Sequence, residues 1–375
     1  MVAMSLRGGN ASNRTQKQHD DIESMSMMQC DTPVYDDFVR DFVASNTGPD
    51  SQPVVEIARK FCDSWPVPCA HAGSAQSESV KPESVKPESA QSESAQPESA
   101  QSESAQPEST KQPTTVRVGV MDSSFNPPHY CHGAYMECLG IMELMPAARG
   151  QHAWSEARVL GIDAFLLLLA AKNADKPLKG SSLEQRMRMV DMLATTVVKD
   201  TTADTWHLWK SRAQFDASNL HNMAIGMVNS PRFVDKCKAV SNVVQSEWER
   251  IKGGPVPRVL SYFAMGWDTL IRVFDPKYYS DYPRELDEFF ANGGRIAYSR
   301  RVGFPDADVD AFFARHEMAT YLQYIFELKL PKRVKHISSS DVRVAVRDST
   351  QSVRDIPPRI LEFVNNFQLY RKDRL

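Results

Sequence analysis

The stretch from Val116 to Gly133, VRVGVMDSSFNPPHYCHG, decides the fold of this chain. Valine recurs at alternate positions from Val116 to Val120, and alternating β-branched residues are typical of a short strand. Polar residues follow, and Asn126 with the proline pair after it stops the strand. Proline has a fixed φ and no N–H, so it is suited to the first turn of a helix. The stretch therefore predicts a strand that leads into a helix across a tight loop.

Two histidines, His129 and His132, lie three residues apart at the predicted start of this helix. Residues at this spacing share one helix face, beside the unpaired N–H groups and the positive end of the helix dipole. Such a corner favours a phosphate group, and the sequence contains neither a P-loop nor a GxGxxG motif. A helix cap formed by a packed histidine pair is the other interpretation. A zinc site would lack a third ligand at metalloprotease spacing.

The segment SFNPPHYCH, residues 124–132, resembles the SFNPxHxGH signature of HxGH-type nucleotidyltransferases, in particular of nicotinamide or nicotinate mononucleotide adenylyltransferases. Two features depart from the signature. Cys131 stands where the signature has glycine, and Asp122 with Ser123 stands where many members have a glycine pair. The site residues that the resemblance implies here are the catalytic His129 and His132 and the nucleotide-binding Ser124, Phe125 and Asn126.

Two further segments resemble landmarks of the same family. LLLLAAKNADKP, residues 166–177, joins an apolar strand to a lysine-bearing loop before a helix of ERxxM type. YFAMGWDTLIRVFDPKYY, residues 262–279, resembles the GxD turn that binds the nucleotide substrate, and its aromatic end matches the fungal-type branch of the family best. The binding residues that these segments imply are Lys176, Gly266, Trp267 and Asp268. An exposed loop lysine and a helix N-cap at Asp268 are the structural alternatives.

The segment HISSSDVRVAVR, residues 336–347, resembles the ISSTxxR motif that closes the ATP site in this superfamily. Ser338 and Asp341 have the spacing of a capping box, so the serines are predicted to lie at a helix N-terminus. Arg343 follows just over one turn later, and an arginine can bind two phosphate oxygens at once. The resemblance implies binding by Ser338 and Ser339 and catalysis by Arg343. A capped helix with a surface arginine is the alternative.

Residues 115–375 alternate predicted strands and helices, which favours a Rossmann-like, doubly wound parallel α/β sheet of the nucleotidyltransferase type. The continuous apolar run at residues 165–169 is typical of a central strand covered on both faces. A helix is predicted from Ser182 to Val198. The remaining strands are predicted at residues 223–228, 259–265, 296–298 and 334–337.

The first 114 residues divide into three parts. Residues 1–30 lack periodicity and are predicted to be disordered. Residues 31–66 show apolar residues at helical spacing and are predicted to form two amphipathic helices that pack on the core. Residues 67–114 contain a five-residue acidic Ser/Glu/Pro repeat that has no apolar face, so they are predicted to be an extended linker. A partner-docking module and a phosphorylated or partner-binding tract are the alternatives.

Composition limits the classes of partner and compartment. The formal net charge of −3 provides no general attraction to nucleic acid or to an anionic membrane. No apolar run reaches membrane-spanning length, and the six cysteines form no CxxC pair, so we expect free thiols in a reducing compartment. These features favour a cytoplasmic or nuclear protein. The basic first eighteen residues are only a weak sign of an organelle presequence.

The resemblance implies adenylyl transfer from ATP to nicotinamide or nicotinate mononucleotide, which gives NAD or its acid analogue and pyrophosphate. The expected partners are therefore ATP, a pyridine mononucleotide and Mg²⁺ that is bound mainly through the ATP phosphates; a homo-oligomer is compatible with the sequence. One alternative is adenylyl or cytidylyl transfer to another phosphorylated metabolite. The other is a nucleotide-binding regulatory protein without catalysis, which the departures at Cys131 and Asp122 would suit.

Overall fold

A computed structural model describes the chain in nine segments. They are residues 33–48, 51–68, 114–140, 145–146, 161–172, 180–199, 220–300, 303–348 and 353–371.

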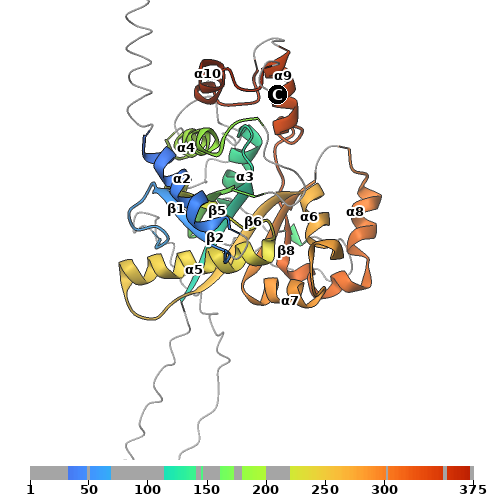
Figure 1. The fold of residues 1–375 in the computed structure, drawn as a ribbon. Coiled ribbons are helices and arrows are strands. Elements are labelled where there is room, and N and C mark those ends of the chain that lie inside the picture. The colour runs from blue at the N-terminus through green and yellow to red at the C-terminus, as the bar shows by residue number, and fades with distance from the viewer. Residues whose placement is uncertain are drawn as a thin grey trace, which may run out of the picture.

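The described residues build one mixed sheet with helices on both faces (Figure 1). The strands are β1 (Val55–Lys60), β2 (Thr115–Ser123), β3 (Met145–Pro146), β4 (Ala164–Ala170), β5 (Met223–Val228), β6 (Arg258–Gly266), β7 (Gly294–Ser299) and β8 (Ile325–Glu327). The helices are α2 (Pro33–Asn46), α3 (Tyr130–Gly140), α4 (Leu183–Lys199), α5 (Phe233–Lys252), α6 (Trp267–Val273), α7 (Arg284–Ala291), α8 (Asp306–Phe313), α9 (Ser339–Arg347) and α10 (Pro358–Asn366). Short 3₁₀ helices span Pro276–Tyr278, His316–Thr320 and Leu322–Tyr324.

The eight strands lie in the order β1-β5-β4-β2-β6-β7-β8-β3. Every pairing from β5 to β8 is parallel, and β1 and β3 pair antiparallel at the two edges. The chain starts the parallel part at β2, adds β4 and β5 on one side, and then adds β6, β7 and β8 on the other. This order confirms the predicted doubly wound sheet. In such a sheet the ligand site lies at the carboxyl ends of the strands, where the order reverses.

Side chains of β4 alternate between two hydrophobic cores, one on each face of the sheet. Every residue of β4 is buried, as expected for a central parallel strand. Phe165 and Leu167 pack in the core that α2, α3, α4, α9 and α10 cover, whereas Leu166 and Leu168 pack in the core under α5, α6, α7 and α8. Figure 1 shows these two groups of helices on opposite sides of the sheet.

The prediction of a second amphipathic helix within residues 31–66 is wrong. Residues 55–60 form β1, which pairs antiparallel with β5 from Val55↔Val228 to Lys60↔Ala224. In VEIARK the apolar residues Val55 and Ile57 also fit a period of two. Strand β5 is buried along its whole length, and its edge needs a hydrogen-bonding partner. Residues 55–60 therefore form a strand with a period of two and not a helix with a period of 3.6.

The prediction of a strand at residues 334–337 is also wrong. The segment forms turns, in which Val334 and Ile337 are buried as anchors in the core beside α9. The sixth parallel strand is instead β8. Pro331, whose carbonyl accepts bonds from the N–H groups of Val334 and Lys335, starts this turn.

The first predicted helix, by contrast, is present as α2 and packs on α4. Val39 and Phe42 are 0% and 1% exposed in the core, and Asp36 forms an ion pair with Arg188 of α4. Farther along, Trp65 is fully buried and its Nε1 donates to the Phe165 carbonyl at 3.0 Å. The N-terminal segments are therefore part of the core.

We expect a chain that begins at Pro113 to lose stability or solubility, because it lacks Trp65, the apolar face of α2 and the strand that covers β5. Replacing residues 74–110, which lie outside the described residues, by a short Gly/Ser linker should leave the melting temperature and turnover nearly unchanged. Loop-closure entropy changes by only roughly 0.6 kcal/mol per halving of loop length. Melting temperature and sedimentation are compared for the full chain, the chain that begins at Pro113 and the chain with the Gly/Ser linker. Equal stability of the shortened chain would make the N-terminal segments a separate docking module.

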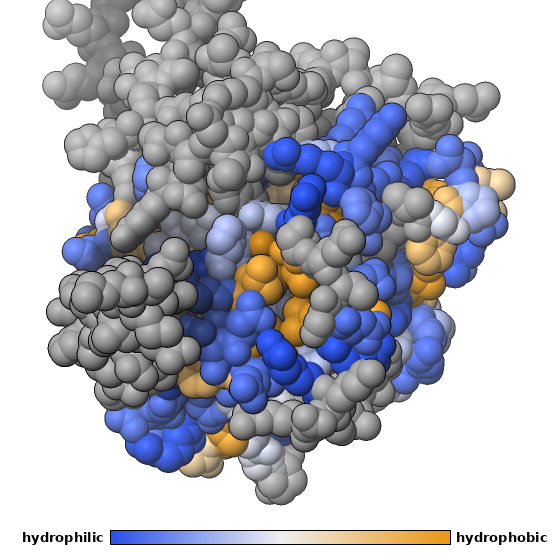
Figure 2. All heavy atoms as spheres, turned by 90° about the horizontal axis from the view of Figure 1, so that it is seen from above, coloured by the Kyte–Doolittle hydropathy of each residue, from blue (hydrophilic) through white to orange (hydrophobic). Residues whose placement is uncertain are grey.

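Most of the coloured residues seen from above are hydrophilic, and hydrophobic residues lie near the middle of that view (Figure 2). Exposed large hydrophobic side chains in the described segments are Val256, Ile271, Phe304, Val344 and Phe367. Among those segments, no helix has the length and apolar character needed to cross a membrane. The cysteines that they contain are Cys62, which is partly exposed, and Cys131, Cys138 and Cys237, which are buried.

Candidate active site

The loop between β2 and α3 carries the two histidines of the first motif. His129 and His132 are 3% and 5% exposed, and their rings stack with centroids 3.8 Å apart. The backbone N–H of His129 donates to Nδ1 of His132 at 3.1 Å, and Nε2 of His132 lies 3.3 Å from Oγ of Ser123. Because Nδ1 is an acceptor, a neutral His132 ring carries its proton on Nε2. The pair thus caps the helix, as one interpretation predicted, and the same contacts fix the orientation of the imidazole.

Cys131, the departure from the signature, packs away from solvent. It is 4% exposed and belongs to the hydrophobic core on the α3 and α4 face. The thiol therefore takes up core volume.

Helix α9 attaches directly to the loop before His129. Ser338 is its N-cap and accepts a bond from the N–H of Asp341 at 3.2 Å, which confirms the predicted cap. Oγ of Ser339 donates to the Pro127 carbonyl at 2.9 Å, and Nη1 of Arg343 donates to the Asn126 carbonyl at 2.6 Å. Two motifs that lie more than 200 residues apart in the sequence are therefore joined at one corner of the sheet.

Arg186 of α4 joins the same corner, although it was not among the site residues predicted from the sequence. Its side chain is 1% exposed, and its Nε donates to the carbonyl of Ser181 at 3.0 Å. Its Nη1 donates to the carbonyl of Ser124 at 3.4 Å. Burial lowers the pKa of this guanidinium, and the charge of Arg343 lowers it further. The positive charges of Arg186 and Arg343 thus repel each other, and an anion bound beside them would relieve this repulsion.

A signal for Arg186 was present in the sequence. It lies on the apolar stripe of α4, next to Met187 and one turn before Val190, where a cation is unexpected. A charged residue on a buried helix face marks a site with a specific partner.

The GxD turn joins β6 to α6. Gly266 is the N-cap of α6 and Asp268 lies in its first turn, so the alternative that placed the cap at Asp268 is wrong. The side chain of Trp267 is 2% exposed and packs against Tyr298, Phe312 and Phe313. Lys176 lies outside the described residues, so its predicted role is not tested.

A cavity of about 240 Å³ opens beside this corner at the carboxyl ends of the strands. Its lining residues are Asp122, Ser123, Ser124, Ala170, Lys172, Pro231, Arg232, Phe233, Lys236, Thr269, Arg272, Val273, Tyr278 and Tyr279. Four of these side chains are cationic, one is a carboxylate, and three are aromatic. Such a lining suits a ligand that combines a flat ring with an anionic group. The four cations were not among the residues predicted from the sequence.

Lys236, one of the four cations that line the cavity, forms an ion pair with Asp122, which is the second departure from the signature. Nζ of Lys236 lies 2.5 Å from Oδ2 of Asp122, and the two side chains are 4% and 8% exposed. Nζ also lies 4.9 Å from the centre of the Phe233 ring. Asp122 thus fixes Lys236 against the cavity wall.

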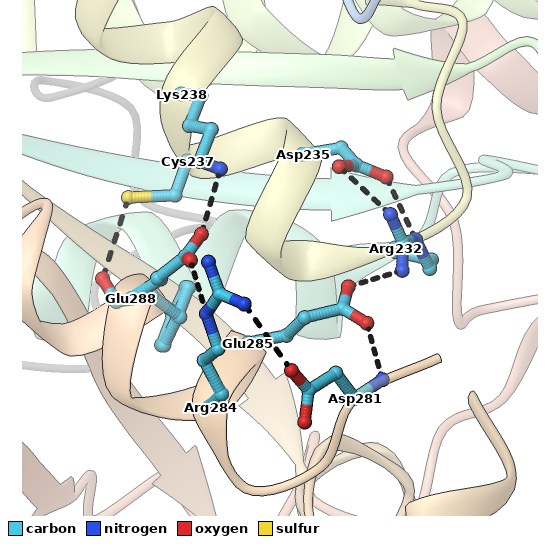
Figure 3. A network of polar contacts seen from close by, with 9 residues as sticks. Arg232, Asp235, Cys237, Lys238, Asp281, Arg284, Glu285 and Glu288 are labelled. Carbon is cyan, nitrogen blue, oxygen red and sulfur yellow. Dashed lines mark hydrogen bonds and ion pairs between the residues drawn. The ribbon is translucent and has the colours of Figure 1, made fainter. Parts of the chain in front are cut away.

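Arg232, a second lining cation, is held by two carboxylates (Figure 3). It pairs with Asp235 at 2.8 and 3.1 Å and with Glu285 at 2.5 Å. Burial alone would lower the pKa of Arg232, but the bonds and charges of these carboxylates raise it. Glu285 also accepts from the N–H groups of Ser280 and Asp281 at 2.8 and 2.9 Å. These contacts tie the cavity to the loop that follows Tyr278 and Tyr279.

Comparisons with known proteins agree with the motifs. No family model matches the chain. Over 265 residues, 67% of this chain and 85% of the relative, it is 28% identical to a Schizosaccharomyces pombe protein described as "Putative nicotinamide mononucleotide adenylyltransferase". The printed name of this relative agrees with the resemblance of the motifs to mononucleotide adenylyltransferases.

Two solved structures are also similar to the chain. One is Plasmodium falciparum nicotinic acid mononucleotide adenylyltransferase complexed with APC, at 12% identity and a TM-score of 0.41, which covers 69% of this chain and 98% of that one. The other is a "Putative Nicotinate-nucleotide Adenylyltransferase" from Vibrio parahaemolyticus, at 14% identity and a TM-score of 0.33, which covers 68% of this chain and 96% of that one.

Proposed function

We propose that this chain is a nucleotidyltransferase that transfers the adenylyl group of ATP to nicotinamide or nicotinate mononucleotide. The products are NAD or its acid analogue and pyrophosphate. The observation that carries the proposal is the contact of α9 with the loop of residues 126–127, because it joins two phosphate-binding motifs next to the cationic, aromatic cavity. An enzyme that couples two nucleotides needs such a pair of adjacent sites.

In this reaction the 5′-phosphate of the mononucleotide attacks the α-phosphorus of ATP. A new P–O bond forms, and the bond between the α-phosphorus and the bridging oxygen breaks as pyrophosphate leaves. A phosphate monoester with a second pKa near about 6 is already ionised at neutral pH, so the reaction requires no general base. The work of the protein is therefore positioning and stabilisation of developing charge.

The residues divide between the two nucleotides. His129 and His132 contact the α- and β-phosphates, while Arg343 with Ser338 and Ser339 holds the β- and γ-phosphates. Arg186, which lies beside Arg343, supplies a further positive charge. The cavity receives the pyridine mononucleotide, and its aromatic and cationic walls support this assignment. Asp268 accepts hydrogen bonds from that nucleotide.

Mg²⁺ accompanies ATP in this proposal and is held by the phosphates. The described part of the chain contains no group of three or more His, Cys, Asp or Glu side chains that could hold a metal ion. The polar groups at the corner are hydroxyls, imidazoles and guanidiniums, which suit phosphate oxygens better than a bare cation. When bound, Mg²⁺ would neutralise part of the triphosphate charge. The cysteine spacing of the sequence, which has no CxxC pair, favours a cytoplasmic or nuclear site for the reaction. We also propose that the chain can form a homo-oligomer.

Purified protein with ATP, Mg²⁺ and either mononucleotide should form a dinucleotide and release an equal amount of pyrophosphate. Chromatography of the dinucleotide and a coupled pyrophosphate assay measure both products. CTP in place of ATP, and other phosphorylated metabolites in place of the mononucleotide, are the controls. Turnover with another acceptor alone would show a different transferase, and ATP binding without pyrophosphate release would show a regulatory protein.

A further inference from the structure

The described part of the chain ends near a buried turn at residues 368–370. This turn lies behind the loop of residues 124–132 and the start of α9, which together we call the phosphate corner. After α10, Gln368 and Tyr370 adopt φ values of 49° and 62°. Residues other than glycine rarely have a backbone in this left-handed region. The N–H of Leu369 bonds back to the Val364 carbonyl at 2.9 Å. Leu369 and Tyr370 are 4% and 2% exposed. Burial of these two large side chains offsets the cost of the unusual backbone.

The hydroxyl of Tyr370 reaches the first motif through one intermediate residue. It lies 2.9 Å from Oγ of Ser181, and that Oγ donates to Oδ1 of Asn126, also at 2.9 Å. Nε of Arg186 donates to the same Oγ at 3.2 Å. A serine hydroxyl has one proton and two acceptor positions. Because its proton goes to Asn126, Ser181 accepts from both Tyr370 and Arg186, and its capacity is complete.

Tyr370 can donate this hydrogen bond to Ser181 only while its phenol is protonated. Burial raises the pKa of Tyr370 to about 12, although the bond to Ser181 and the charges of Arg186 and Arg343 lower it in part. The phenol therefore stays neutral near pH 7 and remains a donor. With Oδ1 of Asn126 bound to Ser181, the amide nitrogen of Asn126 is directed to the other side of the side chain.

Close packing around Gly180 restricts the positions of the Tyr370 and Asn126 side chains. At Gly180, with φ of 92°, an added Cβ would come within 3.0 Å of the Tyr370 ring and 3.2 Å of Oδ1 of Asn126. Gly180 therefore lets the ring and the amide lie close together. The backbone carbonyl of Asn126 is held independently by Arg343.

We propose that Tyr370 is a positioning residue for nucleotidyl transfer: through Ser181 it fixes the side chain of Asn126 in the phosphate-binding loop. This inference rests on the proposed function for its kinetic part. Tyr370 itself lies behind the loop and touches no reacting atom. Its role is to keep the Asn126 amide in one orientation while charge develops on the phosphates, because preorganised donors are the effective ones.

The test is Tyr370→Phe, which removes only the hydroxyl and keeps the buried ring. We expect kcat to fall about tenfold, because an Asn126 amide that is no longer fixed stabilises the developing charge less well, with little change in the KM for ATP. Hydrogen exchange measured by mass spectrometry should be faster in the peptide that covers residues 124–132. Tyr321→Phe is the matched control, because this buried tyrosine donates to Asp287 at 2.6 Å and lies outside the phosphate corner. It should lower stability and leave both readouts unchanged.

A double variant separates this pathway from general loosening of the fold. Ser181→Ala breaks the same path, so Tyr370→Phe should add little to it if the effect runs through Ser181. Unchanged kcat and unchanged exchange in Tyr370→Phe, with an active parent protein, would overturn the inference alone. If the parent protein makes no dinucleotide, the proposed function fails, and the exchange experiment still decides whether Tyr370 fixes the loop.

Discussion

We expect replacement of His132 or Arg343 by alanine to lower turnover by about two decades or more while the fold stays intact. Each substitution removes a donor that the structure orients before substrate arrives: His132 through Ser123 and the His129 N–H, Arg343 through the Asn126 carbonyl. Losing one preorganised donor to developing charge costs about 10²–10³ in rate. Initial rates of pyrophosphate release at saturating ATP and mononucleotide measure the effect.

Matched substitutions distinguish a local effect from unfolding. His221→Ala removes an exposed histidine, and Arg347→Ala removes an arginine one turn farther along α9 that pairs with Asp348. Both should retain full turnover. Arg343→Lys keeps the charge but loses the planar fork, so its rate should lie between those of the parent protein and of Arg343→Ala. Normal activity in His132→Ala or Arg343→Ala, with melting temperatures equal to that of the parent protein, would remove that residue from the site.

Replacing Lys236 by methionine should lower the free energy of unfolding by about 3–5 kcal/mol, because the change leaves a buried carboxylate without its counter-charge. The pair is almost completely shielded from solvent, at 4% and 8% exposure. Oδ1 of Asp122 has no hydrogen-bond partner within the described residues, so Lys236 provides the main compensation for this charge. Because stability is typically only about 5–15 kcal/mol, the loss should be easy to measure by urea unfolding.

The control for this prediction is Lys238→Met, two residues farther along α5. Lys238 pairs with Glu288, but the two side chains are 45% and 39% exposed, so the change should cost less than about 1 kcal/mol. Combining Lys236→Met with Asp122→Asn should recover much of the loss, since the uncompensated charge is removed. Equal effects of Lys236→Met and Lys238→Met would mean that burial of the first pair does not matter.

The sequence predicted well those features that depend on neighbours along the chain. The strand before Ser123, the helix start after the proline pair and the cap at Ser338 each follow from local chemistry, and the structure has all three. The local pattern gave the wrong element at residues 55–60. VEIARK fits both a helical and a strand period, and pairing with the edge of β5 makes it a strand. The local pattern also failed at residues 334–337, where two buried anchors lie in a turn.

The candidate site was predictable in its motifs but not in its contacts. The bond from Arg343 to Asn126 spans 217 residues, and no local rule reaches that far. For the same reason Asp122 could be interpreted only as a departure from the signature, because its partner Lys236 follows 114 residues later. Arg186 was visible as a charge on an apolar stripe, but its meaning depended on the loop that it contacts.

Val67 and Thr114, the described residues on either side of the repeat-bearing tract, bond near the amino ends of the central strands. On one side, Asn222, just before β5, donates to the Val67 carbonyl at 3.1 Å and to the Asp163 carbonyl at 2.7 Å, just before β4. On the other side, the Thr114 carbonyl accepts from the N–H of Arg258 at 2.8 Å, where β6 begins. Both anchors lie at the amino ends of the strands, opposite the phosphate corner. Because both ends of the tract are held there, we expect a change in its length to act on the side of the sheet opposite the proposed site.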